Sequence, residues 1–408
     1  MPGKPQNDAR RTRILLGVSA AAFLGPFTQT VYVPSLVEIG GFLHANAFMV
    51  NLTISLFTAI LAISSFIVGP LADARGRRAV LIPGMLAYVA GSLVCLLASS
   101  YWVFLAGRVV QACGISTGSV VAAAVIGDLY APKERLHAMN TYQLLLFLGP
   151  VFGPVIGGLV AGYLHWQWAF GVLVAAGLAV TAYVAARLPE TLAGAAFGNR
   201  LTLAGVRSVL GNASARSILL IGFSQFYGYY VFLVFLPRLA EQFGLTTAEK
   251  GFAFVPLTAG ILAGISGARR WLAHWPGRRI LRFASYALAA DVLLLWLLLA
   301  GDALSIPLLG TVLLIYGVLL GGSLPAQSTI LVNLFTAERA TAMGIYNFTR
   351  FMGAAAGPLL AALIADAFGS PAMLAALGAL LLVSAWVIQR ALVDPFEQAA
   401  VRESRSGV

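Results

Sequence analysis

Apolar segments that are long enough to cross a lipid bilayer make up most of this chain. A transmembrane helix needs about 20 mostly apolar residues. Only 10% of the 408 residues are charged, whereas soluble domains carry roughly 25%. The sequence therefore predicts an all-α integral membrane protein whose twelve transmembrane helices lie at residues 14–39, 47–71, 79–99, 101–127, 138–163, 168–187, 217–240, 251–268, 281–301, 305–333, 340–366 and 371–393.

One long polar interruption divides these segments into two sets of six. It runs from Arg187 to Arg216 and contains Gly, Asn and Arg residues that do not continue an apolar run. We therefore expect an N-terminal six-helix half at 1–187, a cytoplasmic linker at 188–216 and a C-terminal six-helix half at 217–408.

The basic residues are distributed unevenly between the two sides of the predicted membrane. With the N-terminus inside, every Lys and Arg falls in a cytoplasmic segment except Arg238 and Lys250 outside, and Arg108 and Arg350 within spans. Short cytoplasmic loops are enriched in Lys and Arg, so both termini are expected in the cytoplasm. The net charge of +11 is then an orientation signal, and it requires no nucleic-acid partner.

The two predicted halves carry the same motifs at the same spacing. Shifted by half its length, the chain places Glu134-Arg135-x-x-Ala138-Met139-x-x-Tyr142 on Glu338-Arg339-x-x-Ala342-Met343-x-x-Tyr346. The match continues through two glycines and a proline of the fifth span and their counterparts in the eleventh. An even number of helices in each copy keeps both in one orientation, which predicts pseudo-symmetric halves with a solute path between them.

A polar motif connects the second and third predicted spans. The stretch Gly69-Pro-Leu-Ala-Asp73-Ala74-Arg75-Gly76-Arg77-Arg78 resembles the loop signature of the major facilitator superfamily, except that Ala74 precedes the arginine. A merely basic turn would explain the arginines but neither the acid nor the glycines. The resemblance implies the major facilitator fold.

The same resemblance implies a conformational switch formed by Gly69, Asp73, Gly76, Arg77 and Asp128. Its acids and arginine would form a charge relay that locks the outward-facing state through contact with the eleventh helix. Asp128, at the end of the fourth span, could instead be an ordinary interfacial acid.

The fifth span contains the string Gly149-Pro150-Val-Phe-Gly153-Pro154-Val-Ile-Gly157-Gly158. Small residues four positions apart let helices approach closely, so a packing role is expected whatever the function. The string is also similar to the antiporter signature of drug-exporting members of the superfamily, which implies export.

Further motifs resemble the bicyclomycin and chloramphenicol exporters, a branch of the twelve-helix drug/proton antiporters. They are Tyr32-Val-Pro34-Ser-Leu36, Gln111-Ala-Cys-Gly114 and Leu188-Pro189-Glu190-Thr191. In that branch the first span carries a buried acid two residues before the tyrosine, whereas this chain has Thr30.

Three charged residues inside predicted spans are candidates for proton coupling. Arg108 lies in a stretch that resembles the superfamily's Arg-x-x-Gln-Gly-x-Gly signature, and an arginine within a span costs roughly 2.5–3.5 kcal/mol on insertion scales. Snorkelling to the surface is the alternative for Arg108. For Asp291 and Arg350, three interpretations remain open: a structural pair, a contact of Arg350 with an anion in the cavity, or solvation of Arg350 in the lumen.

The resemblance also implies which spans line the substrate path, chiefly the first, fourth, seventh and tenth, flanked by the second, fifth, eighth and eleventh. Aromatic and amide side chains on such spans suit bulky amphipathic compounds. The candidate cavity residues are Gln29, Tyr32, Asn51, Gln111, Tyr142, Gln143, Gln225, Tyr229, Tyr230, Tyr316, Tyr346 and Asn347.

The sequence does not predict an enzyme. The four histidines map to predicted loops without metal-ligand spacing, and no phosphate-binding G-x-x-x-x-G-K occurs. We therefore expect no metal, no cofactor and no ATP, so that a proton gradient would supply the energy. A membrane-bound enzyme or receptor is the other class, and solute flux in sealed vesicles would discriminate between them.

Together these observations predict a monomeric secondary transporter of the bacterial inner membrane. It would export small hydrophobic or amphipathic compounds, as in multidrug or antibiotic efflux, in exchange for protons by alternating access. Two alternatives remain open because the first-span acid is missing. One is an exporter of a specific metabolite or metal-chelating compound, and the other is a facilitator that is not coupled to protons.

Overall fold

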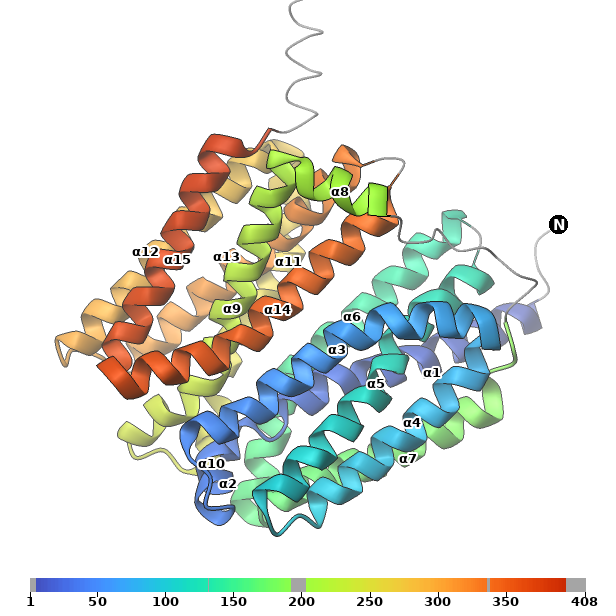
Figure 1. The fold of residues 1–408 in the computed structure, drawn as a ribbon, viewed down its shortest axis with the longest axis horizontal. Helices are drawn as coiled ribbons and strands as arrows, with labels where there is room; N and C mark the ends of the chain where they lie inside the picture. Colours follow the sequence, from blue (N-terminus) through green and yellow to red (C-terminus); the bar gives the residue numbers. More distant parts are fainter. Residues whose placement is uncertain (1–4, 131, 192–202, 336–337, 394–408) are drawn as a thin grey trace, which may run out of the picture. The chain divides into compact units, whose positions relative to one another are not determined.

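A computed structural model describes residues 5–130, 132–191, 203–335 and 338–393 of the chain. These residues form helices that are connected by short turns (Figure 1). The helices are α1 (Pro5–Thr30), η1 (Val33–Ser35), α2 (Leu36–Phe42), α3 (Ala47–Arg75), α4 (Arg77–Leu96), α5 (Tyr101–Leu129), α6 (Pro132–Tyr163), α7 (Gln167–Arg187), α8 (Leu203–Gly211), α9 (Ala213–Gln242), α10 (Thr247–Phe252), α11 (Val255–His274), α12 (Gly277–Ala300), α13 (Ile306–Leu334), α14 (Arg339–Phe368) and α15 (Ser370–Ala391).

In the described ranges, 12 helical stretches are long and apolar enough to cross a membrane, which confirms the predicted all-α membrane architecture. The first stretch is broken into α1, η1 and α2, and the eighth into α10 and α11. Pro34 lies in η1 and Pro256 in the first turn of α11. Because proline lacks an N–H group and disfavours helix just before it, both breaks have a local cause.

The helices group into two compact units. One contains residues 1–198 with 233–254, and the other contains 199–232 with 255–408. This grouping places residues 233–254 with the first unit, where α10 packs on α6 and η1. The predicted boundaries of the two halves stay a prediction. The predicted linker contains the helix α8, and its residues 192–202 lie outside the described ranges.

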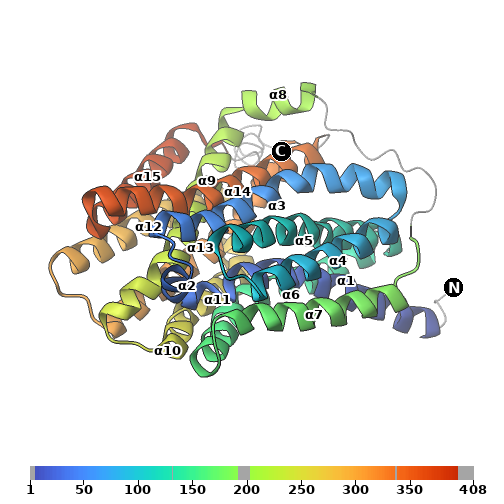
Figure 2. The same ribbon diagram turned by 60° about the horizontal axis from the view of Figure 1, so that its bottom comes forward.

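In the first unit, α1 packs against α5, α6 and α7, while α5 also contacts α3 and α4 (Figures 1 and 2). Glycines let α6 approach α1 closely. A Cβ atom added at Gly149 would lie 2.8 Å from the backbone nitrogen of Phe27, and one added at Gly157 would overlap the Val31 carbonyl. The predicted packing role of this glycine string is therefore visible in the backbone contacts.

In the second unit, α13 packs against α11 and α12, and α15 packs against α12 and α14. The second copy of the glycine motif makes the corresponding contact. Gly353 and Gly357 of α14 lie against the backbone of α9 at Phe223 and Tyr227. The sequence repeat therefore appears as the same kind of close helix pair in each unit.

Burial follows the repeat as well. The first, fourth, seventh and tenth spans are each more than half buried, whereas each of the other eight is less than half buried. Spans six positions apart thus have similar environments. Large apolar side chains such as Ile67, Trp102 and Phe283 are exposed, which a lipid-facing surface accommodates.

Candidate functional site

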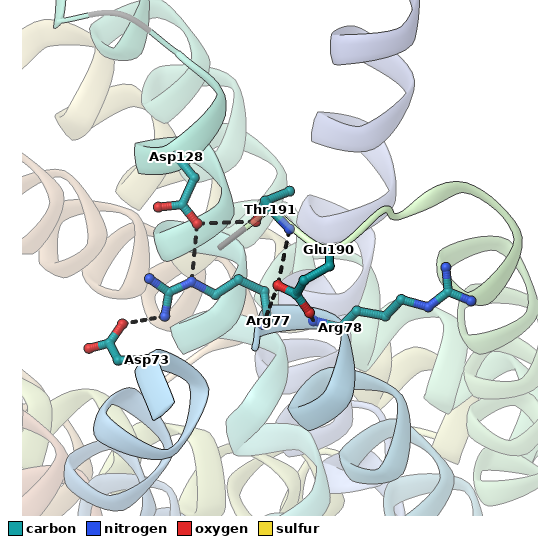
Figure 3. A network of polar contacts seen from close by, with 6 residues as sticks. All are labelled: Asp73, Arg77, Arg78, Asp128, Glu190 and Thr191. Atoms are coloured by element: carbon teal, nitrogen blue, oxygen red, sulfur yellow. Dashed lines mark hydrogen bonds and ion pairs between the residues drawn. The ribbon is translucent and has the colours of Figure 1, made fainter. Parts of the chain in front are cut away.

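A network of charged side chains joins the ends of three helices of the first unit (Figure 3). Arg77, at the start of α4, donates from Nη1 to Asp73 Oδ1 at the end of α3, and from Nε to Asp128 Oδ2 of α5 at 3.1 Å. Arg77 is only 5% exposed, so its charge is compensated by two carboxylates. The structure brings together the three residues of the predicted relay. The relay's contact with the eleventh helix stays a prediction.

Two residues of the segment after α7 complete this network. The Glu190 carboxylate accepts hydrogen bonds from the backbone N–H groups of Arg77 at 2.9 Å and of Arg78 at 3.2 Å. The Thr191 hydroxyl donates to Asp128 Oδ2 at 3.1 Å. A carboxylate at a helix N-terminus satisfies free N–H groups and interacts favourably with the helix dipole. Glu190 therefore connects the end of the sixth span to the start of the third.

The glycine at the turn between α3 and α4 is required by this geometry. Gly76 has φ of +100°, which side chains rarely allow. A Cβ atom there would also lie 2.8 Å from the Glu190 carboxyl carbon. By contrast, Gly69 has only the tip of a Val120 methyl group near its Cβ position, at 3.9 Å. Of these two predicted switch glycines, Gly76 is thus the one whose lack of a side chain the structure explains.

A second polar cluster surrounds Arg108, which is 1% exposed on α5. Its guanidinium lies over the rings of Phe57 at 4.1 Å and Tyr32 at 4.5 Å. It donates to Gln111 Oε1 and, at 3.2 Å, to the Tyr32 hydroxyl. Gln111 in turn donates to Ser92 Oγ at 2.7 Å. Among the described residues, the Arg108 cation is thus stabilised by cation–π contacts and by neutral hydrogen-bond acceptors.

Thr30 occupies the position at which related exporters were expected to carry an acid. Its hydroxyl donates to the carbonyls of Pro26 at 3.0 Å and Gly149 at 3.4 Å. A Cβ atom at Gly153 would overlap this hydroxyl. Position 30 therefore lies in the close contact between α1 and α6, which has no room for a larger side chain.

The second unit contains a buried network of amide and hydroxyl groups between α9, α13 and α14. Gln225 Oε1 accepts from Ser323 at 2.9 Å and from Gln327 at 2.8 Å. Gln327 Oε1 accepts from the Tyr346 hydroxyl at 3.0 Å. The Tyr316 hydroxyl donates to the Gln225 carbonyl at 3.2 Å. Three predicted cavity residues, Gln225, Tyr316 and Tyr346, are thus connected here through Ser323 and Gln327.

Asp291 and Arg350 do not meet in the structure. None of the ion pairs among the described residues involves either side chain. Asp291 is 6% exposed on α12, and its Oδ2 atom has no hydrogen-bond partner in these ranges. Its carboxyl interacts electrostatically with Tyr316. The Arg350 guanidinium lies 3.9 Å from the Phe226 ring centroid.

The other predicted cavity residues differ in how deeply they are buried. Gln29, Asn51, Tyr142, Tyr229 and Tyr230 are buried, whereas Gln143 and Asn347 are exposed. The Tyr229 and Tyr230 rings form an edge-to-face pair with centroids 5.4 Å apart. No three His, Cys, Asp or Glu side chains in the described ranges gather as metal ligands.

Sequence reasoning missed the structural role of Glu190 and Thr191. In the sequence, the segment Leu188-Pro189-Glu190-Thr191 carries only a resemblance to the exporter branch. An acid that follows a span by a few residues can cap the N-terminus of another helix, but the sequence alone does not say which helix.

Comparison with curated proteins finds transporters. The chain is 25% identical to Multidrug resistance protein D of Escherichia coli (strain K12) over 292 residues, which are 66% of this chain and 74% of that protein. It is 33% identical to a Chloramphenicol resistance protein of Pseudomonas aeruginosa over 178 residues, or 43% of this chain and 42% of that protein. This second match thus spans less than half of the relative's length, as do several others.

Comparison with solved structures supports the fold. The crystal structure of a D-xylose-proton symporter matches with a TM-score of 0.76 and 15% identity, covering 94% of this chain and 98% of that one. Residues 18–351 match the family described as the Major Facilitator Superfamily. With its twelve spans, its repeated halves and the Asp73–Arg77–Asp128 network, this chain belongs to the Major Facilitator Superfamily of membrane transporters.

Proposed function

We propose that this transporter exports small hydrophobic or amphipathic compounds from the cytoplasm in exchange for protons, by alternating access. The observation that carries the proposal is Asp291. It is a buried carboxyl well inside α12, with an unsatisfied oxygen and no ion pair among the described residues. A buried carboxyl without a cationic partner favours its neutral form. Asp291 is therefore suited to hold a proton in one state and to release it in another.

The direction of transport is inferred from the fifth span and from the relatives. The glycine string places Gly157 against Val31, directly after α1, and Gly158 against α10, so α6 packs closely on two neighbours. The string is similar to the signature of drug-exporting antiporters. Two relatives are named for multidrug and chloramphenicol resistance. Export of amphipathic compounds agrees with both observations.

In the proposed orientation both termini lie in the cytoplasm of a bacterium, and the chain works as a monomer in the inner membrane. The network of Asp73, Arg77 and Asp128 then lies at the cytoplasmic face. Arg108 would place its guanidinium beside the path, so that protonation elsewhere changes the balance of charge within the membrane. Asp291 and Arg108 would thus act in proton coupling from different units.

Inside-out vesicles whose lumen is acidified by respiration provide the test. Addition of ethidium or chloramphenicol should release protons from the lumen, which a quenched acridine dye reports as recovered fluorescence. The Asp291→Asn variant should lose this proton release while it still exchanges labelled substrate for unlabelled substrate. Asp302→Asn is the matched control, because Asp302 is exposed in the turn after α12, and it should behave like the wild type.

Two results would contradict the proposal. Substrate flux without proton release in the wild type would indicate a facilitator that is not coupled to protons. Proton release that persists in Asp291→Asn would show that another group carries the proton.

A further inference from the structure

Arg350 is a charged side chain in the second unit whose polar contacts among the described residues are with uncharged groups. Its Nη1 atom is 3.5 Å from Asn347 Oδ1, at the limit for a hydrogen bond, and it also lies near the Tyr346 hydroxyl. No ion pair of Arg350 occurs in the described ranges. Arg77, by comparison, contacts two carboxylates. The positive charge of Arg350 is therefore not compensated by the described part of the protein.

Arg350 also has a hydrogen-bond donor without a partner. Its Nε atom is buried and makes no hydrogen bond to the described residues. A hydrogen-bond acceptor would satisfy this free N–H group. A negatively charged acceptor would also compensate the charge of Arg350.

The position of the guanidinium is fixed by its packing. It lies 3.9 Å from the Phe226 ring centroid and 5.0 Å from that of Tyr346. Gly222 of α9 leaves room for both residues of α14, since a Cβ atom there would lie 2.9 Å from the Tyr346 ring and 3.1 Å from Arg350 Cγ. A stacked guanidinium presents its N–H edge in a defined plane, which suits a planar anionic group beside an aromatic body.

A lipid headgroup does not fit this position. Arg350 is eleven residues from the start of α14 at Arg339, which corresponds to about 16 Å along the helix. The side chain is too short to reach a phosphate at the membrane surface from there. The neighbouring Phe226 and Tyr346 rings favour an organic anion over an inorganic one, because they offer apolar area next to the charge.

We propose that Arg350 binds the anionic group of the transported compound, and that the substrates include aromatic organic acids. This inference rests on the proposed transport function and specifies its substrate class. Phe226 and Tyr346, the two rings beside the guanidinium, would contact the aromatic part.

Equilibrium binding to the purified full-length chain in detergent tests the proposal without requiring flux or a proton gradient. Three matched probe pairs are used: benzoate, naphthalene-2-carboxylate and biphenyl-4-carboxylate, each with its carboxamide. Wild-type protein should bind at least one carboxylate about tenfold more tightly than its amide at neutral pH. Arg350→Gln should abolish this preference while it leaves amide affinity within about twofold, and Arg350→Lys should restore part of it.

Arg390→Gln is the matched control. Arg390 is also stacked on an aromatic ring, Trp386 at 5.4 Å, but it is exposed at the end of α15. This variant should keep the wild-type preference for the carboxylate. Melting temperatures of all variants show whether each one is folded.

Three outcomes would overturn the proposal. The first is wild-type protein that binds no carboxylate more tightly than its amide. The second is an Arg350→Gln variant that keeps the preference, and the third is competitive displacement of the carboxylate by low millimolar chloride. If the vesicles release no protons but the purified protein still prefers the carboxylate, proton coupling is rejected and the anion site is still supported. The reverse result would reject the anion site alone.

Discussion

Glu190 accepts a hydrogen bond from the backbone N–H group of Arg77 at 2.9 Å, although the two residues are 113 positions apart. The contact ties the segment after α7 to the first turn of α4. It also places Thr191 against Asp128, so a backbone contact and the charged network support each other.

Replacing Glu190 by Ala should lower the free energy of unfolding by about 1 kcal/mol, since two N–H groups of α4 lose their acceptor. Glu190→Gln should lose less, because it keeps one acceptor oxygen. Thermal unfolding in detergent measures the effect. Glu338→Ala is the control, because Glu338 precedes α14 but makes no side-chain cap bond. An equal loss in both variants would contradict the capping role.

Replacing Gly157 by Ala should destabilise the first unit, because the added methyl group would overlap the carbonyl of Val31, directly after α1. Overpacking of this kind costs about 1–3 kcal/mol. Melting temperature and yield of folded protein measure the loss. Gly344→Ala in α14, where a Cβ atom meets nothing within 4 Å, should be neutral or slightly stabilising. A stable Gly157→Ala variant would mean that α1 and α6 lie farther apart.

Replacing Asp73 by Asn should reduce transport at least about tenfold and leave folding mostly intact. The Asp73 side chain is 37% exposed, so the ion pair contributes little to stability. Arg77 would keep its contact with Asp128, but the charge of the network would change. Efflux of ethidium from intact cells, together with the melting temperature, separates the two effects. Asp366→Asn, at an exposed position near the end of α14, is the control, and normal efflux by Asp73→Asn would exclude the relay.

Asp291→Asn and Arg350→Gln should act independently, because the structure does not bring the two side chains together. The double variant should show the sum of the two single effects on stability within about 0.5 kcal/mol. A double variant that is clearly more stable than this sum would indicate a direct ion pair. Unfolding of the wild type, the two single variants and the double variant in the same detergent gives the four free energies that this comparison requires.

Most of the fold could be predicted from the sequence because the membrane restricts it so strongly. Long apolar runs in lipid form helices, since the backbone has no water to satisfy its polar groups. Finer features of the helices were less predictable. The breaks at Pro34 and Pro256 and the helix α8 inside the expected linker depend on local backbone geometry.

The candidate site was predictable where a short motif carries it. Asp73 and Arg77 lie on either side of the short turn at Gly76, so the motif itself places the two side chains at the same helix connection. The role of Thr30 was not predictable in this way. Its hydroxyl lies between α1 and α6 only because Gly153 of α6 lacks a side chain.

The sequence by itself determined the twelve spans, the repeat of six helices and the residues of the charged loop, because these depend on hydropathy and on spacing along one chain. Only the tertiary structure decided that Glu190 caps α4, that Asp291 lies apart from Arg350, and that the Arg350 guanidinium stacks on Phe226. Contacts of this kind join helices that are distant in sequence. They depend on how each helix is rotated about its axis and on which small residues let two backbones approach.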